Sequence, residues 1–182
     1  MTLFVHAFAS PVGELLGAVE EAGRLVGLEF VDTHRAQALL DGWRAGGREV
    51  VHDVPRCAAV VRQLGEYFAG ERRAFDLEVA PEGTGFQRRV WEELRRIPYG
   101  TTISYGELGR RLGGATFTRA AGRANGANPV AIVIPCHRVI GADGSLVGYG
   151  GGLEVKRALL ELEGALPTAA RHRGEQLTLD LD

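Results

Sequence analysis

The apolar pattern of the chain changes at the segment Ala80-Pro81-Glu82-Gly83, and this change most limits the folds that the chain can adopt. Before the segment, apolar residues alternate or form runs separated by glycine, which is typical of strands and hairpins. After it, short stretches with helical periodicity follow one another, and glycine or proline ends each of them. We therefore expect an α+β protein, with an N-terminal α/β domain over residues 1–80 and a helical domain over residues 84–164.

The first part of the chain is expected to form a small sheet flanked by helices. Gly23 supplies the turn of a hairpin between two apolar runs. Behind Pro55, apolar residues recur at three- and four-residue spacing as far as Gly70, which indicates an amphipathic helix with Cys57 on its buried side. The expected strands are residues 3–8, 15–19, 25–31 and 75–79, and a further helix is expected over residues 35–44.

The second part begins with a helix-start signal that is repeated later. Thr84 with Gln87, and Ser104 with Glu107, have the spacing of a capping box. A glycine pair at residues 113–114 separates two short helices, which suggests a helix-turn-helix. The expected helices are residues 85–97 and 105–111, a third that begins at Thr116 or Thr118 and ends at Asn125, and a last one over residues 153–163 that is capped by Gly164.

Charge is distributed unevenly, although the formal net charge of the 182 residues is only −2. Residues 1–84 hold eight arginines against thirteen acidic residues, a net of −5, whereas residues 85–125 hold eight arginines against three glutamates, a net of +5. The basic segment is the expected surface for a polyanion. The alternative is a solvated helix face with dispersed arginines.

The helix expected to end at Asn125 is rich in small residues and carries Arg119 and Arg123. Gly122 inside this helix lowers helix stability by roughly 0.5–1 kcal/mol relative to alanine. The slim helix surface that the small residues leave should therefore serve a purpose that offsets this cost. Close approach to DNA is one such purpose, and close packing against another helix is the alternative.

The apolar run Ile132-Val133-Ile134-Pro135 places a thiol, an imidazole and a guanidinium side by side at Cys136, His137 and Arg138. The run reads as a short buried extended segment, and we expect Cys136 to lie in rigid, non-helical backbone after the proline. A neighbouring cation can lower the pKa of a thiol, so His137 and Arg138 favour a reactive thiolate. The alternative is that Cys136 is a small core residue.

At this point the sequence resembles a known family. The stretch from Asn128 to Gly141 strongly resembles the active-site signature of the O6-alkylguanine-DNA alkyltransferases, also called methylated-DNA–protein-cysteine methyltransferases. The resemblance is close over residues 85–164 and loose over residues 1–84. It implies a ribonuclease H-like N-terminal domain and a winged-helix-like C-terminal domain with a helix-turn-helix. The supporting segments are residues 103–108, 119–122, 148–153 and 163–164.

The resemblance implies DNA repair by direct damage reversal. The alkyl group of O6-alkylguanine, or of O4-alkylthymine, in double-stranded DNA would pass irreversibly to Cys136 after the damaged base is flipped out of the helix. His137 would act as general base through a water, Glu163 would orient His137, and Asn128 would brace the turn below the site. One molecule would repair one lesion, because the thioether product has no ready leaving group.

The family pattern also implies contacts to DNA and to the flipped base. Arg119 would fill the gap left by the base, and Tyr105 would contact the adjacent phosphate and the guanine N3. The carbonyls of Cys136 and Val139 would accept from the exocyclic amine of the base. The remaining residues expected to contact DNA are Ala120, Gly122, Arg123 and Ala124. Tyr149, Gly150 and Gly151 would complete the alkylguanine pocket. The backbone N–H of Gly150 would donate toward O6.

The sequence departs from the family pattern in places. Gly150 replaces the family's serine, and Arg123 stands at a position that is often small. Some members bind zinc in the first domain, but Cys57 and the histidines of this chain lack metal-site spacing, so we expect neither zinc nor another cofactor. The histidines concerned are His6, His34 and His52.

Other classes of protein remain as alternatives. A DNA-binding regulator would use the helix-turn-helix without a reactive thiol. In a non-enzymatic lesion binder of this family, another residue replaces the cysteine. A cysteine hydrolase or redox sensor would use the thiol in a different reaction. The sequence shows neither a signal peptide nor a membrane span, so we expect a cytoplasmic monomer with no membrane partner and no Cys57–Cys136 disulfide.

Residues 165–182 are expected to form a flexible tail. Its end resembles the bacterial sliding-clamp-binding motif, a glutamine followed by spaced leucines at Gln176, Leu177, Leu179 and Leu181. The alternating leucines could equally add an edge strand to the protein's own sheet.

Overall fold

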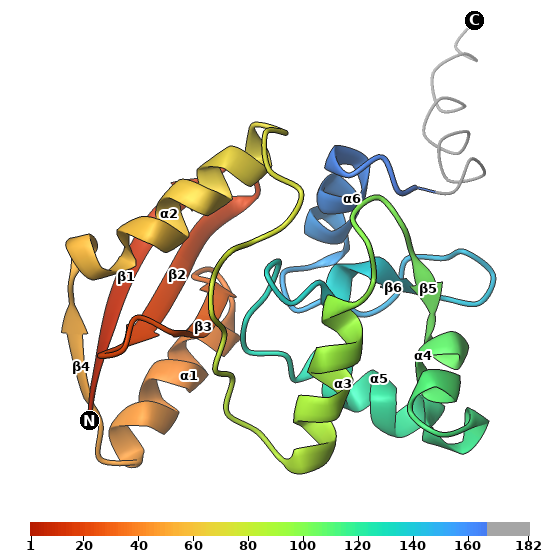
Figure 1. Ribbon diagram of the computed structural model, residues 1–182, viewed down its shortest axis with the longest axis horizontal. Coiled ribbons are helices and arrows are strands. Elements are labelled where there is room, and N and C mark those ends of the chain that lie inside the picture. The colour runs from red at the N-terminus through yellow and green to blue at the C-terminus, as the bar shows by residue number, and fades with distance from the viewer. Residues whose placement is uncertain (167–182) are drawn as a thin grey trace, which may run out of the picture.

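The computed structural model describes residues 1–166 of the chain and consists of a sheet-containing half beside a helical half (Figure 1). The α+β prediction is confirmed. The first half contains β1 (Thr2–Ser10), β2 (Gly13–Glu20), β3 (Leu25–Phe30), α1 (His34–Ala45), β4 (Glu49–His52) and α2 (Val54–Phe68).

The four-stranded sheet has the order β3-β2-β1-β4. β1, β2 and β3 form an antiparallel meander, and β4 pairs parallel to β1. The expected hairpin turn lies at Gly23, whose φ of 82° favours glycine and whose N–H donates to the Glu20 carbonyl at 2.8 Å.

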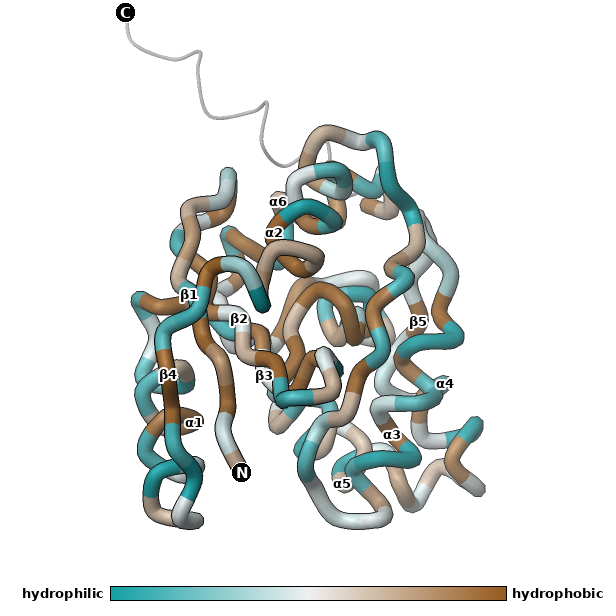
Figure 2. The backbone as a smooth tube through the Cα atoms, turned by 60° about the vertical axis from the view of Figure 1, so that its left-hand side comes forward, coloured by the Kyte–Doolittle hydropathy of each residue, from teal (hydrophilic) through white to brown (hydrophobic). Residues whose placement is uncertain are grey.

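Both faces of the sheet are covered, which explains why β2 and β3 are almost wholly buried. On one face Trp43 of α1 packs against Leu3 and Leu16. On the other, α2 packs through residues of its apolar stripe, among them Cys57 and Leu64, in a core shared with the helical half. Figure 2 shows the hydrophobic character of the strands along the tube.

Two strand predictions need correction. β4 was not expected, because Glu49–His52 has only two central apolar residues and is defined by its pairing with β1. The strand expected at residues 75–79 is wrong, since only Val79 forms an isolated bridge, with Leu25. The Asp76 N–H is instead bound by the Gln63 side chain at 2.9 Å, so the segment has no need of a full strand partner.

The helical half contains α3 (Gly85–Arg95), β5 (Ile103–Ser104), α4 (Tyr105–Arg111), the 3₁₀ turns η1 (Ala115–Phe117) and η2 (Cys136–Arg138), α5 (Thr118–Gly126), β6 (Val139–Ile140) and α6 (Leu153–Leu162). The capping box of α3 is complete, with reciprocal bonds between Thr84 and Gln87. The box expected for α4 is half-formed. Ser104 accepts from the Glu107 N–H at 3.1 Å, but the Glu107 carboxylate binds Arg110 and Arg111 instead.

The helix-turn-helix is formed by α4 and α5, which cross closely at Gly109. A Cβ atom at this position would lie 2.6 Å from Thr118 Oγ1 and 2.9 Å from the Thr118 nitrogen, so only glycine allows the contact. α3 fixes the other side of α5, because Trp91 Nε1 donates to the Ala124 carbonyl at 2.8 Å.

The two halves are joined by backbone hydrogen bonds at β3. Leu28 donates to the Pro129 carbonyl and accepts from the Ala131 N–H, both at 2.8 Å. The segment leading to Cys136 is therefore attached directly to the N-terminal sheet. In residues 1–166, no helix combines the length and the apolar character that crossing a bilayer would require.

Candidate active site

The segment before Cys136 is a compact turn rather than the extended run expected from its sequence. The Asn128 side chain closes it, because Nδ2 donates to the Ile134 carbonyl at 2.8 Å and Oδ1 accepts from the Val130 N–H at 3.0 Å. Ile132 has a φ of 69°, a left-handed conformation that costs a residue with a branched Cβ about 1–3 kcal/mol. The brace that the family resemblance assigns to Asn128 is present in the structure.

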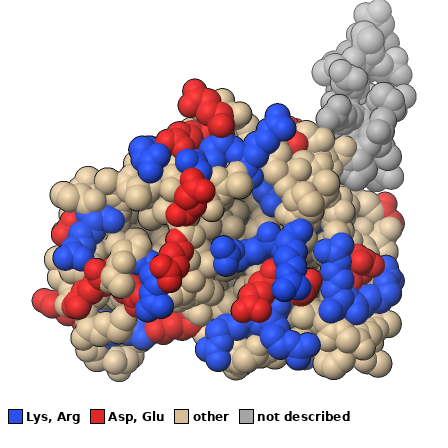
Figure 3. All heavy atoms as spheres, viewed as in Figure 1, with Lys and Arg blue, Asp and Glu red and all other residues tan. Residues whose placement is uncertain are grey.

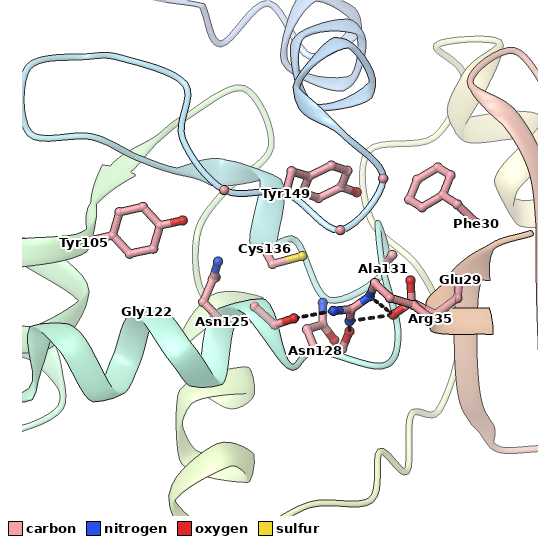
Figure 4. Close-up of a pocket in the computed structure, with 14 residues that line it drawn as sticks. Glu29, Phe30, Arg35, Tyr105, Gly122, Asn125, Asn128, Ala131, Cys136 and Tyr149 are labelled. Atoms are coloured by element: carbon pink, nitrogen blue, oxygen red, sulfur yellow. Dashed lines mark hydrogen bonds and ion pairs between the residues drawn. The ribbon is translucent and has the colours of Figure 1, made fainter. Parts of the chain in front are cut away.

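Cys136 is the first residue of the short 3₁₀ turn η2, so the expectation of non-helical backbone is wrong. Its side chain is 7% exposed and faces a cavity of about 260 Å³. Figure 4 shows the thiol in this cavity between residues of α5 and residues of the N-terminal half. The cavity brings together most of the pocket and catalytic residues expected from sequence, namely Tyr105, Asn128, Cys136, Tyr149, Gly150 and Gly151. Gly122, expected to contact DNA, also lines it.

The expected lowering of the thiol pKa is not found. Burial raises the pKa of Cys136, and a hydrogen bond from Asn128 opposes this only in part. Neither His137 nor Arg138, the two residues after Cys136, supplies an unpaired positive charge. Burial lowers the pKa of His137, which keeps the imidazole neutral, and the Arg138 guanidinium is bound to Glu163. The thiol therefore needs a base to accept its proton when it reacts.

Glu163 is the centre of a buried hydrogen-bond network that fixes His137. Its carboxylate lies 2.8 Å from His137 Nε2 and accepts from Arg138 Nε at 2.9 Å and Nη2 at 3.0 Å. It also accepts from the hydroxyl of Tyr67, on α2 of the other half, at 2.7 Å. Burial alone would raise the pKa of Glu163, but the hydrogen bonds from His137 and Arg138 outweigh it and lower the pKa to about 2.

The ionised Glu163 determines the tautomer of His137. Because a carboxylate only accepts hydrogen bonds, His137 Nε2 carries the ring proton and Nδ1 keeps its lone pair. Nδ1 is buried and has no hydrogen-bond partner among residues 1–166. The imidazole can thus accept one proton at Nδ1, and Glu163 stabilises the resulting imidazolium.

Lys156 of α6 is the only lysine in the chain and is fully buried. Its Nζ donates to the carbonyls of Val139 at 2.6 Å and Val147 at 2.8 Å, which ties the loop after Cys136 to the helix. Burial lowers its pKa to about 8. Val139 itself does not line the cavity, and its carbonyl, expected to accept from the base, already has one donor.

Tyr105 and Asn125 line the cavity on the side of the helix-turn-helix (Figure 4). Burial raises the pKa of Tyr105, against which a hydrogen bond with Asn125 acts in part. The Asn125 Oδ1 is buried and has no partner within residues 1–166. Gly122 faces Tyr105 at ordinary contact distance, 3.6 Å from an added Cβ, so packing against the protein itself does not require glycine there.

The exposed face of α5 carries Arg119 and Arg123. Neither has an ion pair or a side-chain hydrogen bond to any other residue of the described part, 1–166. Figure 3 shows basic side chains gathered over the half that holds α3 and α4. Ala120 is half-buried, whereas Ala124 is only 3% exposed and packs into the core. The expectation that Ala124 contacts DNA is therefore wrong, because it lies on the face of α5 that meets α3.

Sequence reasoning missed several residues that the fold brings to the site: Glu29, Phe30, Arg35, Tyr67, Asn125 and Lys156. The lone lysine within an apolar helix pattern was an available signal. Arg35 and Tyr67 gave no signal, because the site residues that they bind, Gly126 and Glu163, are 91 and 96 residues away. Among residues 1–166, no group of three or more His, Cys, Asp and Glu side chains is arranged to hold a metal ion.

Comparison with protein families gives two matches. Residues 85–165 match the family described as 6-O-methylguanine DNA methyltransferase, DNA binding domain, and residues 3–81 match 6-O-methylguanine DNA methyltransferase, ribonuclease-like domain. The resemblance found in the sequence is thereby confirmed.

Relatives and solved structures agree. A methylated-DNA–protein-cysteine methyltransferase from Methanosarcina acetivorans is 44% identical over 163 residues, covering 90% of this chain and 99% of the relative. One from Mycolicibacterium paratuberculosis is 47% identical over 167 residues, covering 90% and 93%. The crystal structure of Mycobacterium tuberculosis OGT in complex with DNA has a TM-score of 0.77 at 42% identity, covering 90% of this chain and 93% of that one. The chain therefore belongs to the 6-O-methylguanine DNA methyltransferase family.

Proposed function

We propose that this protein repairs alkylated DNA by moving the alkyl group of O6-alkylguanine to the Cys136 sulfur. The observation that carries the proposal is an almost buried thiol that lines a cavity of about 260 Å³ and is followed in the chain by a neutral histidine held by Glu163. The arginines of α5, which lack protein partners in residues 1–166, supply the adjacent surface for DNA. Family membership supports the same assignment.

In the reaction, His137 Nδ1 takes the thiol proton through one water, and Glu163 stabilises the imidazolium. The thiolate attacks the alkyl carbon opposite O6, so that an S–C bond forms as the C–O6 bond breaks. The bonding electron pair goes to the purine, which takes up one proton and leaves as guanine. Tyr105, whose hydroxyl faces the cavity, is the proposed donor to N3 of the base.

Base flipping is proposed to place the lesion in the cavity. Arg119 is exposed near the start of α5, where its side chain can enter the base stack and occupy the space that the flipped nucleotide leaves. Gly122, and Ala120 on the same helix, leave the surface slim enough for the backbone of DNA to approach. Arg123 adds a phosphate contact.

The test of the proposed function is the mass of the intact protein after incubation with duplex DNA containing O6-methylguanine. We expect one methyl group per chain, located in the peptide that contains Cys136, and no gain for Cys136→Ser. A duplex with O4-methylthymine tests whether the same cavity accepts that lesion. Repair of many lesions by one molecule, or a methyl group on another residue, would contradict the proposal.

Three further proposals rest on sequence. We propose that residues 1–80 and 84–164 form two domains, that the protein acts as a monomer, and that it works in the cytoplasm. Sedimentation of the free protein tests whether it is a monomer, since a dimer would contradict that proposal.

Sliding-clamp binding through Gln176, Leu177, Leu179 and Leu181 is also a proposal, and these residues lie outside the described part of the structure. Tethering of this kind would raise the local concentration of the repair protein at replicating DNA. The measurement is binding of purified clamp to the whole chain and to a chain that ends at Arg173. Equal binding by the two, or binding by neither, would exclude a clamp anchor in the tail.

A further inference from the structure

The cavity has two ends, and the N-terminal half forms one of them. In Figure 4, Tyr105 and Asn125 lie on one side of Cys136, whereas Ala131, Arg35 and Phe30 lie on the other. The Cys136 sulfur points toward this second side. A base that enters from the helix-turn-helix therefore has the N-terminal end of the cavity beyond its reactive oxygen.

Arg35 of α1 is held in this end by hydrogen bonds on three sides. Nε and Nη2 donate to Glu29 Oε1 at 2.9 and 2.7 Å, and Glu29 is only 2% exposed. Nη1 donates to the Gly126 carbonyl at 2.6 Å, and Nη2 also donates to the Asn128 carbonyl at 2.8 Å. A guanidinium bound in this way is a fixed wall rather than a mobile surface side chain.

The loop after Cys136 is fitted to this wall. A Cβ atom at Gly150 would lie 2.8 Å from Arg35 Nε and 3.0 Å from its Cδ, and one at Gly151 would lie 2.7 Å from the Phe30 ring. Neither glycine has a positive φ, so the backbone does not require glycine at either position. Their small size instead accommodates the two N-terminal side chains.

The reaction geometry makes this end of the cavity sensitive to the size of the alkyl group. When sulfur attacks opposite O6, the other substituents of the alkyl carbon project sideways from the S–C–O line. A methyl group carries only hydrogens there, whereas a benzyl group must place a ring. With the base on one side, the open direction is toward Ala131, Gly150 and Arg35.

We propose that Arg35, held by Glu29 and packed on Gly150, is a specificity-determining residue that limits the size of the alkyl group transferred to Cys136. The inference rests on the proposed alkyl transfer and assigns to the N-terminal half a direct part in choosing the substrate. It applies to groups larger than methyl.

The experiment compares transfer rates from O6-methylguanine and O6-benzylguanine in the same duplex sequence, each followed by the mass of the intact protein. We expect Arg35→Ala to raise the benzyl-to-methyl rate ratio at least about tenfold, the effect of adding room for a few carbon atoms. The matched control is Arg24→Ala, which also removes an arginine from a buried glutamate, Glu20, but far from the cavity. Its ratio should equal that of the unmodified protein.

A second variant tests the same contact in the opposite direction, in case Arg35→Ala does not fold. Gly150→Ala keeps the backbone N–H but places a methyl group against the fixed Arg35, which narrows this end of the cavity, so the benzyl-to-methyl ratio should fall. In the Arg35→Ala/Gly150→Ala double variant the fall should disappear, because the colliding side chain is gone. An unchanged ratio in Gly150→Ala, or in folded Arg35→Ala, would overturn the inference. Absence of any mass gain in the unmodified protein would instead overturn the proposed function.

Discussion

Glu163 shows how one buried charge is kept ionised by its neighbours. Tyr67, His137 and Arg138 all donate to its carboxylate, and the hydrogen bonds from His137 and Arg138 lower its pKa to about 2 against the effect of burial. In an unfolded chain the same carboxyl has its ordinary pKa near 4.5. Because the folded-state pKa is the lower one, the stabilisation is fully present above pH 5 or so and is lost as the pH falls toward 2.

The first prediction at the residue scale concerns this acid sensitivity. The difference in pKa corresponds to about 3 kcal/mol at neutral pH. Glu163→Gln should therefore unfold at lower urea concentration at pH 7 and lose less further stability than the unmodified protein between pH 5 and pH 2. Urea unfolding at a series of pH values is the measurement. Glu66→Gln, at a half-buried carboxylate that also binds two arginines, is the control and should have a smaller effect.

Single residues also show what the sequence could and could not reveal. The roles of Asn128 and Glu163 were expected from the family resemblance, and both side chains make the contacts that those roles require. The expectation that the pKa of the Cys136 thiol is lowered was wrong. His137 is neutral, and the charge of Arg138 is paired with Glu163. Burial, which depends on the whole fold, determines the direction of the shift instead.

At the scale of elements, α5 is the slim helix whose exposed side carries the arginines. Its N-terminus is packed under α4 at Gly109, and its buried side is held by Trp91 of α3. The helix that presents Arg119 and Arg123 is thus held in place from two sides.

A prediction follows for Arg119→Ala. Repair of O6-methylguanine in duplex DNA should slow strongly, because the gap left by the flipped base is no longer filled. Reaction with free O6-benzylguanine requires no flipping and should change little. Rates on both substrates are the measurement, with Arg96→Ala, at an exposed arginine paired with Glu93, as control. Equal loss on both substrates would show that Arg119 supports the fold instead.

Elements with local signals were predictable from sequence, and those made by distant pairing were not. The start of α3 is encoded in Thr84 and Gln87, three residues apart, and was confirmed. β4 exists because Glu49–His52 pairs with Thr2–Val5, and the turn before Cys136 exists because Asn128 bonds across it. The partner of an element cannot be read from its own residues.

At the scale of the whole molecule, the two halves share the active site. Tyr67 and Arg35 come from the N-terminal half, yet one binds Glu163 and the other lines the cavity beside Cys136. With the backbone bonds between β3 and the Pro129–Ala131 turn, they make the position of the thiol depend on both halves.

Tyr67→Phe tests this dependence. The ring and its packing are kept, but Glu163 loses a buried donor, which should lower the free energy of unfolding by roughly 1.5–3 kcal/mol. Transfer from free O6-benzylguanine should slow as well, because the carboxylate that holds His137 is less well fixed. Urea unfolding and single-turnover rates are the measurements. Tyr99→Phe removes a hydroxyl bonded to a backbone carbonyl at 3.2 Å and serves as the control. An unchanged rate would mean that the N-terminal half does not help to position His137.

The burial of Lys156 gives the protein a built-in chemical reporter. Since this is the only lysine and it is fully buried, the folded chain offers an amine-reactive acylating reagent no lysine side chain. A molecule that opens around α6 offers one. The number of acyl groups per chain, counted before and after the thiol is alkylated, would therefore show directly whether carrying the removed alkyl group loosens the protein.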